Sequence, residues 1–419
     1  MSNKEERKAP VLRFKGFTDD WEQRKLGDKI TRIKSYSISH GYETMHDTNT
    51  KYIHYGDIHT GKVKIINDIN ILPNIKDNNY IGLNKGDIVV ADASEDYKGI
   101  ADACLVNTDT DSNKIVAGLH TIALRPQKDT YPQYLYTYLS TDIFKHFGYK
   151  TGTGLKVFGI SYKELAKFLV SSPSIKEQKK ISKLISLIEK NIDLQQRKLN
   201  ELKEVKKTLL SQLFPSKGQY RPIIRFKKFT NKWTKRKLGN IAKIIGGGTP
   251  STSNHDYWNG NINWYSPTEI GNNIFVNSSN KKISIKGLNN SSAKLLPGGK
   301  TILFTSRAGI GNMAIMLTDG CTNQGFQSWV IDDTKIDIYF LYSLGRLLKH
   351  DAIRQASGST FLEISNKEVK KLLLEIPSFT EQKLIGNMLR KIDDDIVRQK
   401  ERIILITKIK KNLLQKLFV

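Results

Sequence analysis

The chain has 419 residues, enough for two or three domains with buried cores. Its 67 lysines and arginines exceed its 41 aspartates and glutamates by 26, and a surplus of this size favours a polyanionic partner. No stretch approaches about 18 uninterrupted apolar residues, the first ten residues lack the apolar core of a signal peptide, and two cysteines by themselves form neither a disulfide framework nor a zinc site. The composition predicts a cytoplasmic protein that binds nucleic acid rather than a membrane.

The first element of the chain recurs later in the sequence. RFKGFTDDWEQRKLGD begins at Arg13, and RFKKFTNKWTKRKLGN begins at Arg225. Ten of the fifteen positions of Arg13–Gly27 are identical in Arg225–Gly239, at matching spacings. This similarity indicates an internal duplication. Trp21 and Trp233 lie in the repeated text, and we expect them in domain cores.

Each repeated segment is followed by a divergent region with short β-rich runs. These include GDIVVADAS at Gly86 and HTIALRP at His120 in the first half, and KTILFTSR at Lys300 and QSWVIDD at Gln327 in the second. One helical hairpin element follows in each half, beginning at Tyr131 and at Asp337. The pattern predicts two mainly-β domains, at 13–170 and 225–376, with a tail at 1–12 and a basic linker at 215–224.

Each half ends in a long amphipathic segment, at 171–214 and 377–419. Glu177-Gln178-Lys179 near the start of the first matches Glu381-Gln382-Lys383 in the second. The favoured role of the two glutamates is capping of the helix start. Apolar residues at steps of three and four predict a helix with one apolar stripe, and a helix of about 40 residues is too long to bury that stripe on one small domain. We expect the two helices to pack together as a coiled coil, through Ile181, Ile188, Ile192, Leu202, Leu209, Ile385, Ile392, Ile396, Ile406 and Leu413. The alternatives are that each helix packs on its own domain or pairs between chains.

Motifs for catalysis do not reach the usual patterns. GGGTPS at Gly246 lacks the Gly-Lys-Ser/Thr of a phosphate loop, and TGTGLK at Thr151 matches ASGSTF, without the lysine, in the other half. His54 and His59 have no evident third metal ligand. These observations favour a protein that reads nucleic acid without modifying it.

Sequence reading requires polar side chains at base edges in addition to cations on phosphates. The divergent loops supply such residues, and a turn residue without DNA contact is the alternative for each. The candidates are Ser94, Lys98, His120, Lys156, Thr249, Ser251, Arg307, Asn323 and Gln324.

Taken together, the two RFK segments, the paired IKEQKKI and FTEQKLI, GGGTPS, and TSRAGIGN with NQGF resemble the specificity subunit of type I restriction–modification enzymes over essentially the whole chain. The resemblance implies an α+β fold with two mainly-β target recognition domains in pseudo-twofold repeat. Each domain is followed by a conserved helix, Ser174–Phe214 or Ser378–Val419, and the helices pair antiparallel. It also implies that each domain reads one half of a split, asymmetric site in double-stranded DNA.

In that family the partners are methyltransferase subunits, here expected to be two, and restriction subunits. S-adenosylmethionine, ATP and Mg²⁺ would bind to those partners, and this chain would bind no cofactor and no metal. Two alternatives remain. A self-contained nucleic-acid-modifying enzyme would transfer methyl groups or cleave DNA alone, and a coiled-coil scaffold would bind nucleic acid without sequence preference.

Overall fold

The computed structural model describes residues 9–94, 99–110, 113–154, 158–216, 218–307, 309–357 and 362–418. The chain divides into two compact units. The first comprises Met1–Gln196 with Arg402–Val419, and the second comprises Arg197–Glu401. Each unit therefore contains one β-rich domain, the beginning of the long helix that follows it, and the end of the other long helix.

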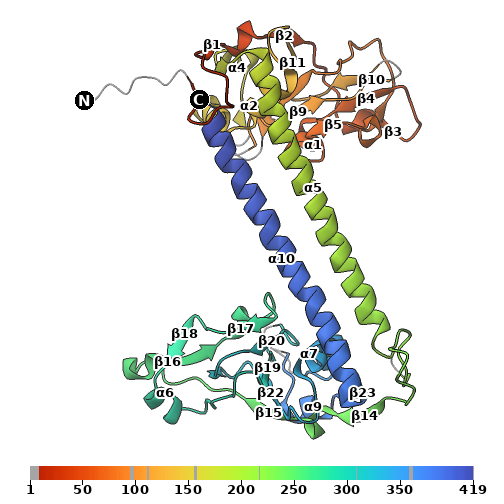
Figure 1. Cartoon of the computed structure of the whole chain (residues 1–419), viewed down its shortest axis with the longest axis vertical. Helices are drawn as coiled ribbons and strands as arrows, with labels where there is room; N and C mark the ends of the chain where they lie inside the picture. The colour runs from red at the N-terminus through yellow and green to blue at the C-terminus, as the bar shows by residue number, and fades with distance from the viewer. Residues whose placement is uncertain are drawn as a thin grey trace. The chain divides into compact units, whose positions relative to one another are not determined.

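The first unit is built around a five-stranded sheet (Figure 1). β11 is antiparallel to both β2 and β7, β7 is antiparallel to β9, and β5 is parallel to β9. Its residues are β-branched or apolar where they face the core, for example Ile88, Val90 and Leu124, which are fully buried. The strands, in sheet order, are β2 (Ile30–Ile33), β11 (Thr121–Pro126), β7 (Ile88–Ala91), β9 (Ala103–Val106) and β5 (Ile65–Ile66).

The remaining elements of the first unit surround this sheet. A second sheet has the order β10-β4-β6-β3, and two strand pairs, β1-β13 and β12-β8, complete the β-structure. The helical hairpin element expected from Tyr131 is present as the two consecutive helices α2 and α3. The bounds are β1 (Glu22–Lys25), β3 (Glu43–Thr44), β4 (Thr50–Ile53), α1 (Tyr55–His59), β6 (Asn74–Ile75), β8 (Ala93–Ser94), β10 (Lys114–Ala117), α2 (Pro132–Leu139), α3 (Asp142–Thr151), β12 (Phe158–Gly159), α4 (Tyr162–Leu165) and β13 (Leu169–Ser172).

The second unit repeats the main sheet with the same order and the same directions. β22 is antiparallel to β15 and β19, β19 is antiparallel to β20, and β17 is parallel to β20. The duplication therefore extends through the regions where the two sequences diverge. The strands, in sheet order, are β15 (Ala242–Gly246), β22 (Gln327–Ile331), β19 (Thr301–Phe304), β20 (Met313–Met316) and β17 (Phe275–Val276).

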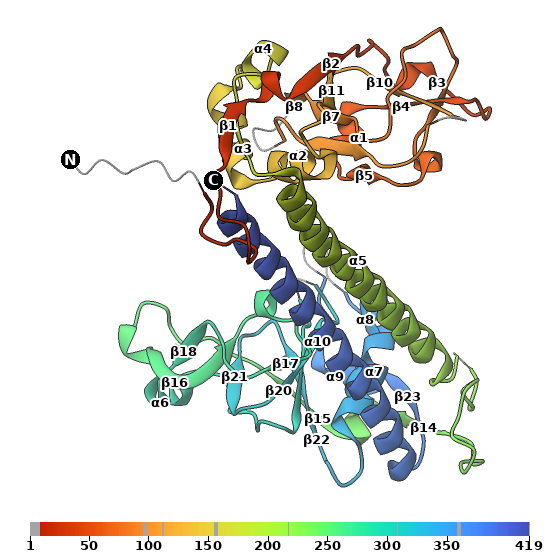
Figure 2. The same cartoon turned by 45° about the horizontal axis from the view of Figure 1, so that its top comes forward.

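The second unit differs from the first in its smaller sheet, which has three strands in the order β18-β16-β21 (Figure 2). The strand pair β14-β23 matches β1-β13. The bounds are β14 (Thr234–Lys237), β16 (Trp258–Tyr265), β18 (Lys281–Ile283), α6 (Ile285–Asn289), β21 (Gly320–Thr322), α7 (Ile338–Leu347), α8 (Lys349–Arg354), α9 (Asn366–Lys371) and β23 (Leu373–Ile376).

The repeated tryptophans are core residues, as the sequence predicts. Trp21 is 4% exposed and lies edge-on to Tyr134, with ring centroids 6.2 Å apart. Trp233 is 2% exposed and packs on Phe340 at 5.8 Å. Burial of such a large aromatic side chain removes much apolar surface from water and so stabilises the folded state of each unit. The repetition of these tryptophans is therefore explained by packing.

The two long helices are α5 (Ile175–Gln212) and α10 (Phe379–Leu417), of 38 and 39 residues. In the first unit Lys410 of α10 donates a hydrogen bond to Glu189 of α5 at 2.5 Å. In the second unit Lys206 of α5 pairs with Asp393 of α10. The beginning of each helix thus pairs with the end of the other, which confirms the antiparallel coiled coil.

The predicted stripe residues meet across the helices at the helix ends, where Leu413 packs against the core that contains Ile181 and Leu209 against the core that contains Ile385. Ile181, Ile385 and Ile396 are buried. The beginnings of the helices also pack on their own domains, since Ile181 belongs to the core of the first unit and Ile385 to that of the second. The structure therefore combines coiled-coil packing with the first of the alternatives. The other residues of the predicted stripe are partly buried: Ile188, Ile192, Leu202, Leu209, Ile392, Ile406 and Leu413.

The ends of the helices enter the core of the unit in which they finish. Phe214, just after α5, lies 5.5 Å from Phe340, centroid to centroid, in the second unit. Phe418, just after α10, stacks on Tyr134 at 5.4 Å in the first unit. Phe214 and Phe418 occupy matching places in the repeat, so an equivalent aromatic contact holds the end of a long helix in the core of each unit.

Candidate nucleic-acid interface

A buried ion pair joins the repeated RFK segment to the beginning of the long helix. The guanidinium of Arg13 donates two hydrogen bonds to Glu177, at 2.9 and 2.8 Å, and Arg225 does the same to Glu381, at 2.7 and 2.8 Å. Each glutamate side chain is 1% exposed. The pairing raises the pKa of Arg13 and of Arg225. The capping interpretation of Glu177 and Glu381 was therefore incomplete, because their carboxylates hold an arginine distant in sequence.

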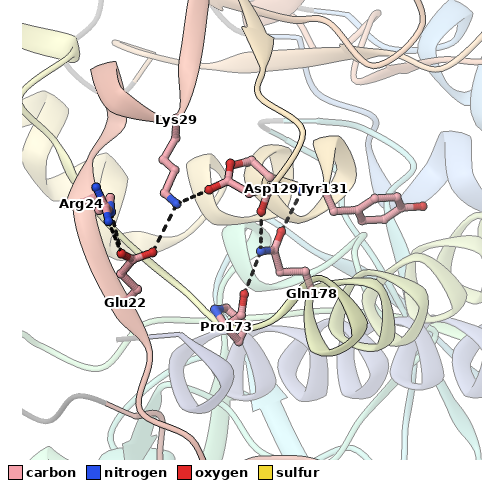
Figure 3. Close-up of polar contacts among 8 residues, drawn as sticks. Glu22, Arg24, Lys29, Asp129, Tyr131, Pro173 and Gln178 are labelled. Atoms are coloured by element: carbon pink, nitrogen blue, oxygen red, sulfur yellow. Dashed lines mark hydrogen bonds and ion pairs between the residues drawn. The ribbon is translucent and has the colours of Figure 1, made fainter.

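The neighbouring glutamine fixes the helix to the turn before α2 or α7. Figure 3 shows Gln178 donating to the carbonyl oxygens of Asp129 and Pro173, at 3.1 and 2.9 Å, and accepting from the N–H of Tyr131 at 2.7 Å. Gln382 likewise donates to the Pro377 carbonyl at 3.0 Å and accepts from the Asp337 N–H at 3.1 Å. A buried side-chain amide whose oxygen and nitrogen are both hydrogen-bonded fixes the relative positions of the segments that it joins. The repeated Glu-Gln is thus structural.

A buried lysine supports the same turn in the first unit. Lys29 is 3% exposed, and its Nζ lies 2.7 Å from Asp129 Oδ2 and 3.6 Å from Glu22 Oε2 (Figure 3). Its hydrogen bond lowers the pKa of Asp129. The Arg–Glu pair and the glutamine therefore hold each domain to the beginning of its long helix. We call these contacts, together with the main sheet, the frame of each unit.

The divergent loops gather at one end of each main sheet, which we call the loop end. In the second unit it consists of the residues after β15, after β19 and before β22. Because β22 runs antiparallel to β15 and β19, these residues share one end of the sheet. In the first unit the same end follows β2 and β7 and precedes β11.

Four predicted residues of the second unit lie at this loop end. Thr249 donates its hydroxyl proton to Gln324 Oε1 at 2.6 Å, and Arg307 forms an ion pair with Glu363 at 2.8 Å between Nη2 and Oε2. Asn323 accepts the N–H of Gly325 at 2.8 Å through Oδ1, which stabilises the turn. Three of these side chains, those of Thr249, Gln324 and Arg307, therefore offer polar groups in one region.

Ser251 lies just beyond them and has a local structural role. Its hydroxyl is 2.8 Å from that of Ser253, and its carbonyl accepts from the indole N–H of Trp258 at 3.1 Å. The Ser251 side chain is exposed. The contacts fix the loop after β15, on which Thr249 also lies.

The glycines of GGGTPS are explained by close backbone approach. A Cβ atom at Gly247 would lie 2.1 Å from the carbonyl oxygen of Asn323, and one at Gly248 would lie 2.2 Å from Ser292 Oγ. Both contacts are too short for any side chain. The glycine run therefore lets the strand end reach the Asn323 turn, and the comparison with a phosphate loop has no support here.

In the first unit His120 occupies the corresponding turn. It has φ 54, an unusual value for a residue other than glycine. Its Nδ1 lies 3.4 Å from Asp92 Oδ1, and the His120 side chain is 48% exposed. Burial raises the pKa of Asp92, and His120 opposes that rise. An aromatic cluster continues from His120 to Tyr55 at 5.3 Å, from Tyr55 to His54 at 4.5 Å, and from His54 to His40 at 4.1 Å, centroid to centroid.

His59, beside this cluster, is held by two acceptors. Its Nδ1 lies 3.1 Å from Asp102 Oδ2 and its Nε2 lies 2.7 Å from the Ala93 carbonyl oxygen. A carboxylate and a carbonyl only accept hydrogen bonds, so both contacts are satisfied together by the imidazolium form. The hydrogen bond to Asp102 raises the pKa of His59. Among the described residues no group of three or more His, Cys, Asp or Glu side chains is arranged to hold a metal ion.

Ser94, another predicted residue of the first unit, does not reach this surface. Ser94 is 3% exposed and lies in β8, paired with Phe158 of β12. Its burial places it inside the domain. Lys98 and Lys156 lie outside the described residues.

Sequence reasoning missed Asp92 and Glu363 at the two loop ends, and the lysine–acid pairs of the coiled coil. Asp92 directly follows a buried strand, a position that could have identified it. Lys206 and Lys410 are separated by 204 residues, as are Glu189 and Asp393. The same offset relates the two Glu-Gln-Lys segments, so the repeat itself contained that signal.

Comparison with known proteins assigns the chain to a family. A model of the family described as "Type I restriction modification DNA specificity domain" matches residues 18–204 and 230–407. The chain therefore belongs to the type I restriction–modification DNA specificity family. None of the helices in the described part of the chain is both long enough and apolar enough to cross a membrane.

Individual relatives agree with this assignment. The chain is 32% identical over 195 residues to the type I restriction enzyme MjaIX specificity subunit of Methanocaldococcus jannaschii, an alignment that spans 46% of this chain and 45% of that protein. It is 24% identical over 304 residues to a putative MjaX specificity subunit of the same organism, spanning 69% of this chain and 68% of that protein. The crystal structure of the type I restriction–modification S subunit from M. genitalium has the same fold, with a TM-score of 0.61, 14% identity, and coverage of 98% of this chain and 99% of that one.

Proposed function

We propose that this chain is the specificity subunit of a type I restriction–modification complex and that it reads a bipartite, asymmetric site in double-stranded DNA. Each β-rich domain would read one half-site at its loop end. The observation that supports this proposal most strongly is the contrast between frame and loops. The two units share the Arg–Glu pair, the hydrogen bonds of the buried glutamine and the sheet topology. Their loop ends differ, because one presents His120 with Asp92 and the other presents Arg307 with Gln324.

Charge supports DNA as the ligand. The net charge of +26 provides many cations for phosphates, and such contacts give affinity and register without reading sequence. Discrimination between bases then depends on the few polar groups at each loop end. Two different half-sites require different polar side chains at the two loop ends, and these can be carried on equivalent domains.

The proposed partners are two methyltransferase subunits and restriction subunits. S-adenosylmethionine, ATP and Mg²⁺ would bind to those subunits and not to this chain, which would have no catalytic activity of its own. Exposed apolar side chains on the paired helices are consistent with a further protein partner: Leu187 and Leu194 on α5, and Val397, Ile404 and Leu405 on α10.

The test is co-expression of the chain with the methyltransferase encoded beside it, in a host without DNA methylation, followed by modified-base sequencing. Two short defined blocks around a fixed unspecified gap would support the proposal. An assembled complex that yields no such motif would contradict it. Methylation or cleavage by the chain alone would instead favour a self-contained enzyme.

A further inference from the structure

Arg307 lies on a loop whose backbone is closed by its own hydrogen bonds. Thr305 donates its hydroxyl proton to the Gly309 carbonyl at 2.7 Å and accepts the Asn312 N–H at 3.0 Å through the same oxygen. Gly309 and Gly311 have φ values of +106° and +85°, which favour glycine. Thr305 thus ties the described residues on both sides of residue 308 together, and the Arg307 side chain beside them is half-exposed.

Glu363 orients the guanidinium from a second segment. Its backbone N–H donates to the Ser357 carbonyl at 3.0 Å, and the next residue, Ile364, donates to the Ser306 carbonyl at 3.2 Å. The backbone of Glu363 is therefore held beside the end of β19, and its Oε2 lies 2.8 Å from Arg307 Nη2. A guanidinium has five planar N–H donors and no acceptor, so Arg307 has more N–H donors than its single ion-pair contact with Glu363 uses.

We propose that Arg307 reads a guanine in the half-site of the second domain and that Glu363 is its positioning residue; this inference rests on the proposed function. In the major groove only guanine presents two neighbouring acceptors, N7 and O6, whereas adenine presents one acceptor and one donor, thymine one acceptor, and cytosine a donor. A donor-only fork matches guanine.

The carboxylate also argues against a simple phosphate contact. An arginine whose charge is compensated by Glu363 at 2.8 Å contributes less to phosphate neutralisation than an unpaired one. The ion pair with Glu363, however, orients the plane of the Arg307 guanidinium, which favours a bidentate contact with a base. Gln324, with its Oε1 fixed by Thr249 at 2.6 Å, presents an amide with both donor and acceptor character and is therefore less selective for guanine.

The experiment compares modified-base profiles of the assembled complex for the wild type, Arg307→Ala, Arg307→Lys and Glu363→Gln. We expect the wild-type motif to contain a G·C pair whose selectivity falls about fivefold to a hundredfold in Arg307→Ala. Arg307→Lys, which keeps the charge and loses the fork, should relax the same position. Glu363→Gln should relax it partially, while the other half-site stays unchanged in all three variants. Arg236→Ala serves as the matched control, because Arg236 is an exposed arginine of the same unit on β14.

Three outcomes overturn the inference while leaving the proposed function intact. The first is an unchanged bipartite motif in Arg307→Ala. The second is relaxation at an A·T pair. The third is a uniform fall in methylation with the motif preserved, which identifies a phosphate contact. By contrast, the lack of any bipartite motif in the assembled wild-type complex overturns the proposed function itself.

Discussion

The Arg13–Glu177 pair offers a sharp test of the frame, because its twin, Arg225–Glu381, serves as an internal reference. Arg13→Met leaves the carboxylate of Glu177, 1% exposed, without its arginine. Breaking a buried pair in this way costs about 3–5 kcal/mol. Arg13 itself is 14% exposed, so we expect the lower end, about 3 kcal/mol.

The loss should be confined to the unit that contains the pair. For a domain of this size, about 3 kcal/mol corresponds to a fall in Tm of roughly 6–12 °C. Hydrogen–deuterium exchange read by mass spectrometry resolves the two units, and Arg13→Met should accelerate exchange in β1, β13 and the beginning of α5. Arg225→Met should do the same for β14, β23 and the beginning of α10.

The double variant Arg13→Met/Glu177→Met separates an unpaired charge from a lost contact. Replacing both partners by apolar residues of similar volume removes the buried charge, so the double variant should be more stable than Arg13→Met alone. A double variant as unstable as the single one, or an Arg13→Met loss below about 1 kcal/mol, would refute this account of the pair.

Three further predictions concern other sites. Phe418→Ala should destabilise the first unit, and Phe214→Ala the second, each by about 3–5 kcal/mol in opening free energies derived from hydrogen exchange. Equal effects of one variant on both units would contradict the role of these phenylalanines as core residues of separate units. Asp102 raises the pKa of His59 above its usual value of about 6.5. The contact between protonated His59 and Asp102 therefore stabilises the first unit fully below about pH 6.5, and this stabilisation is lost as the pH rises through the higher pKa of the folded state. Exchange in the first unit should therefore speed up over that range beyond its intrinsic pH dependence, and His59→Gln should remove this extra component; an unchanged component would refute the assignment. Burial raises the pKa of Cys104 and of Cys321 to about 12, so iodoacetamide should label neither thiol in the folded chain and both after denaturation, and rapid labelling of the folded chain would contradict their burial.

The sequence predicted the repeat, the mixed fold, the long helices and the buried tryptophans, because each depends on a local pattern. Apolar residues at helical spacing marked α5 and α10, and short β-branched runs marked β7 and β19. The prediction of a coiled coil followed from the apolar stripe and the helix length together, since a helix of about 40 residues is too long to bury its stripe on one small domain.

What the sequence did not reveal depends on contacts between distant residues. Arg13 and Glu177 are 164 residues apart, and Arg307 and Glu363 meet only because the segment after residue 361 lies beside β19. The capping interpretation of Glu177 relied on a local rule, and a long-range ion pair took precedence. Ser94 was chosen as a loop residue, but β8 pairs with β12 and buries it.

The central claim is that the two domains are independent readers on one repeated frame, and a domain replacement tests it most directly. In a chimera, residues 30–168 would replace the corresponding stretch of the second half, residues 242–372, so that both units keep their Arg–Glu pair and their helix. The complex with the methyltransferase should then modify a site in which both blocks carry the half-site of the first domain. If the assembled chimera instead retains the wild-type asymmetric motif, the domains do not read the half-sites and the account is wrong.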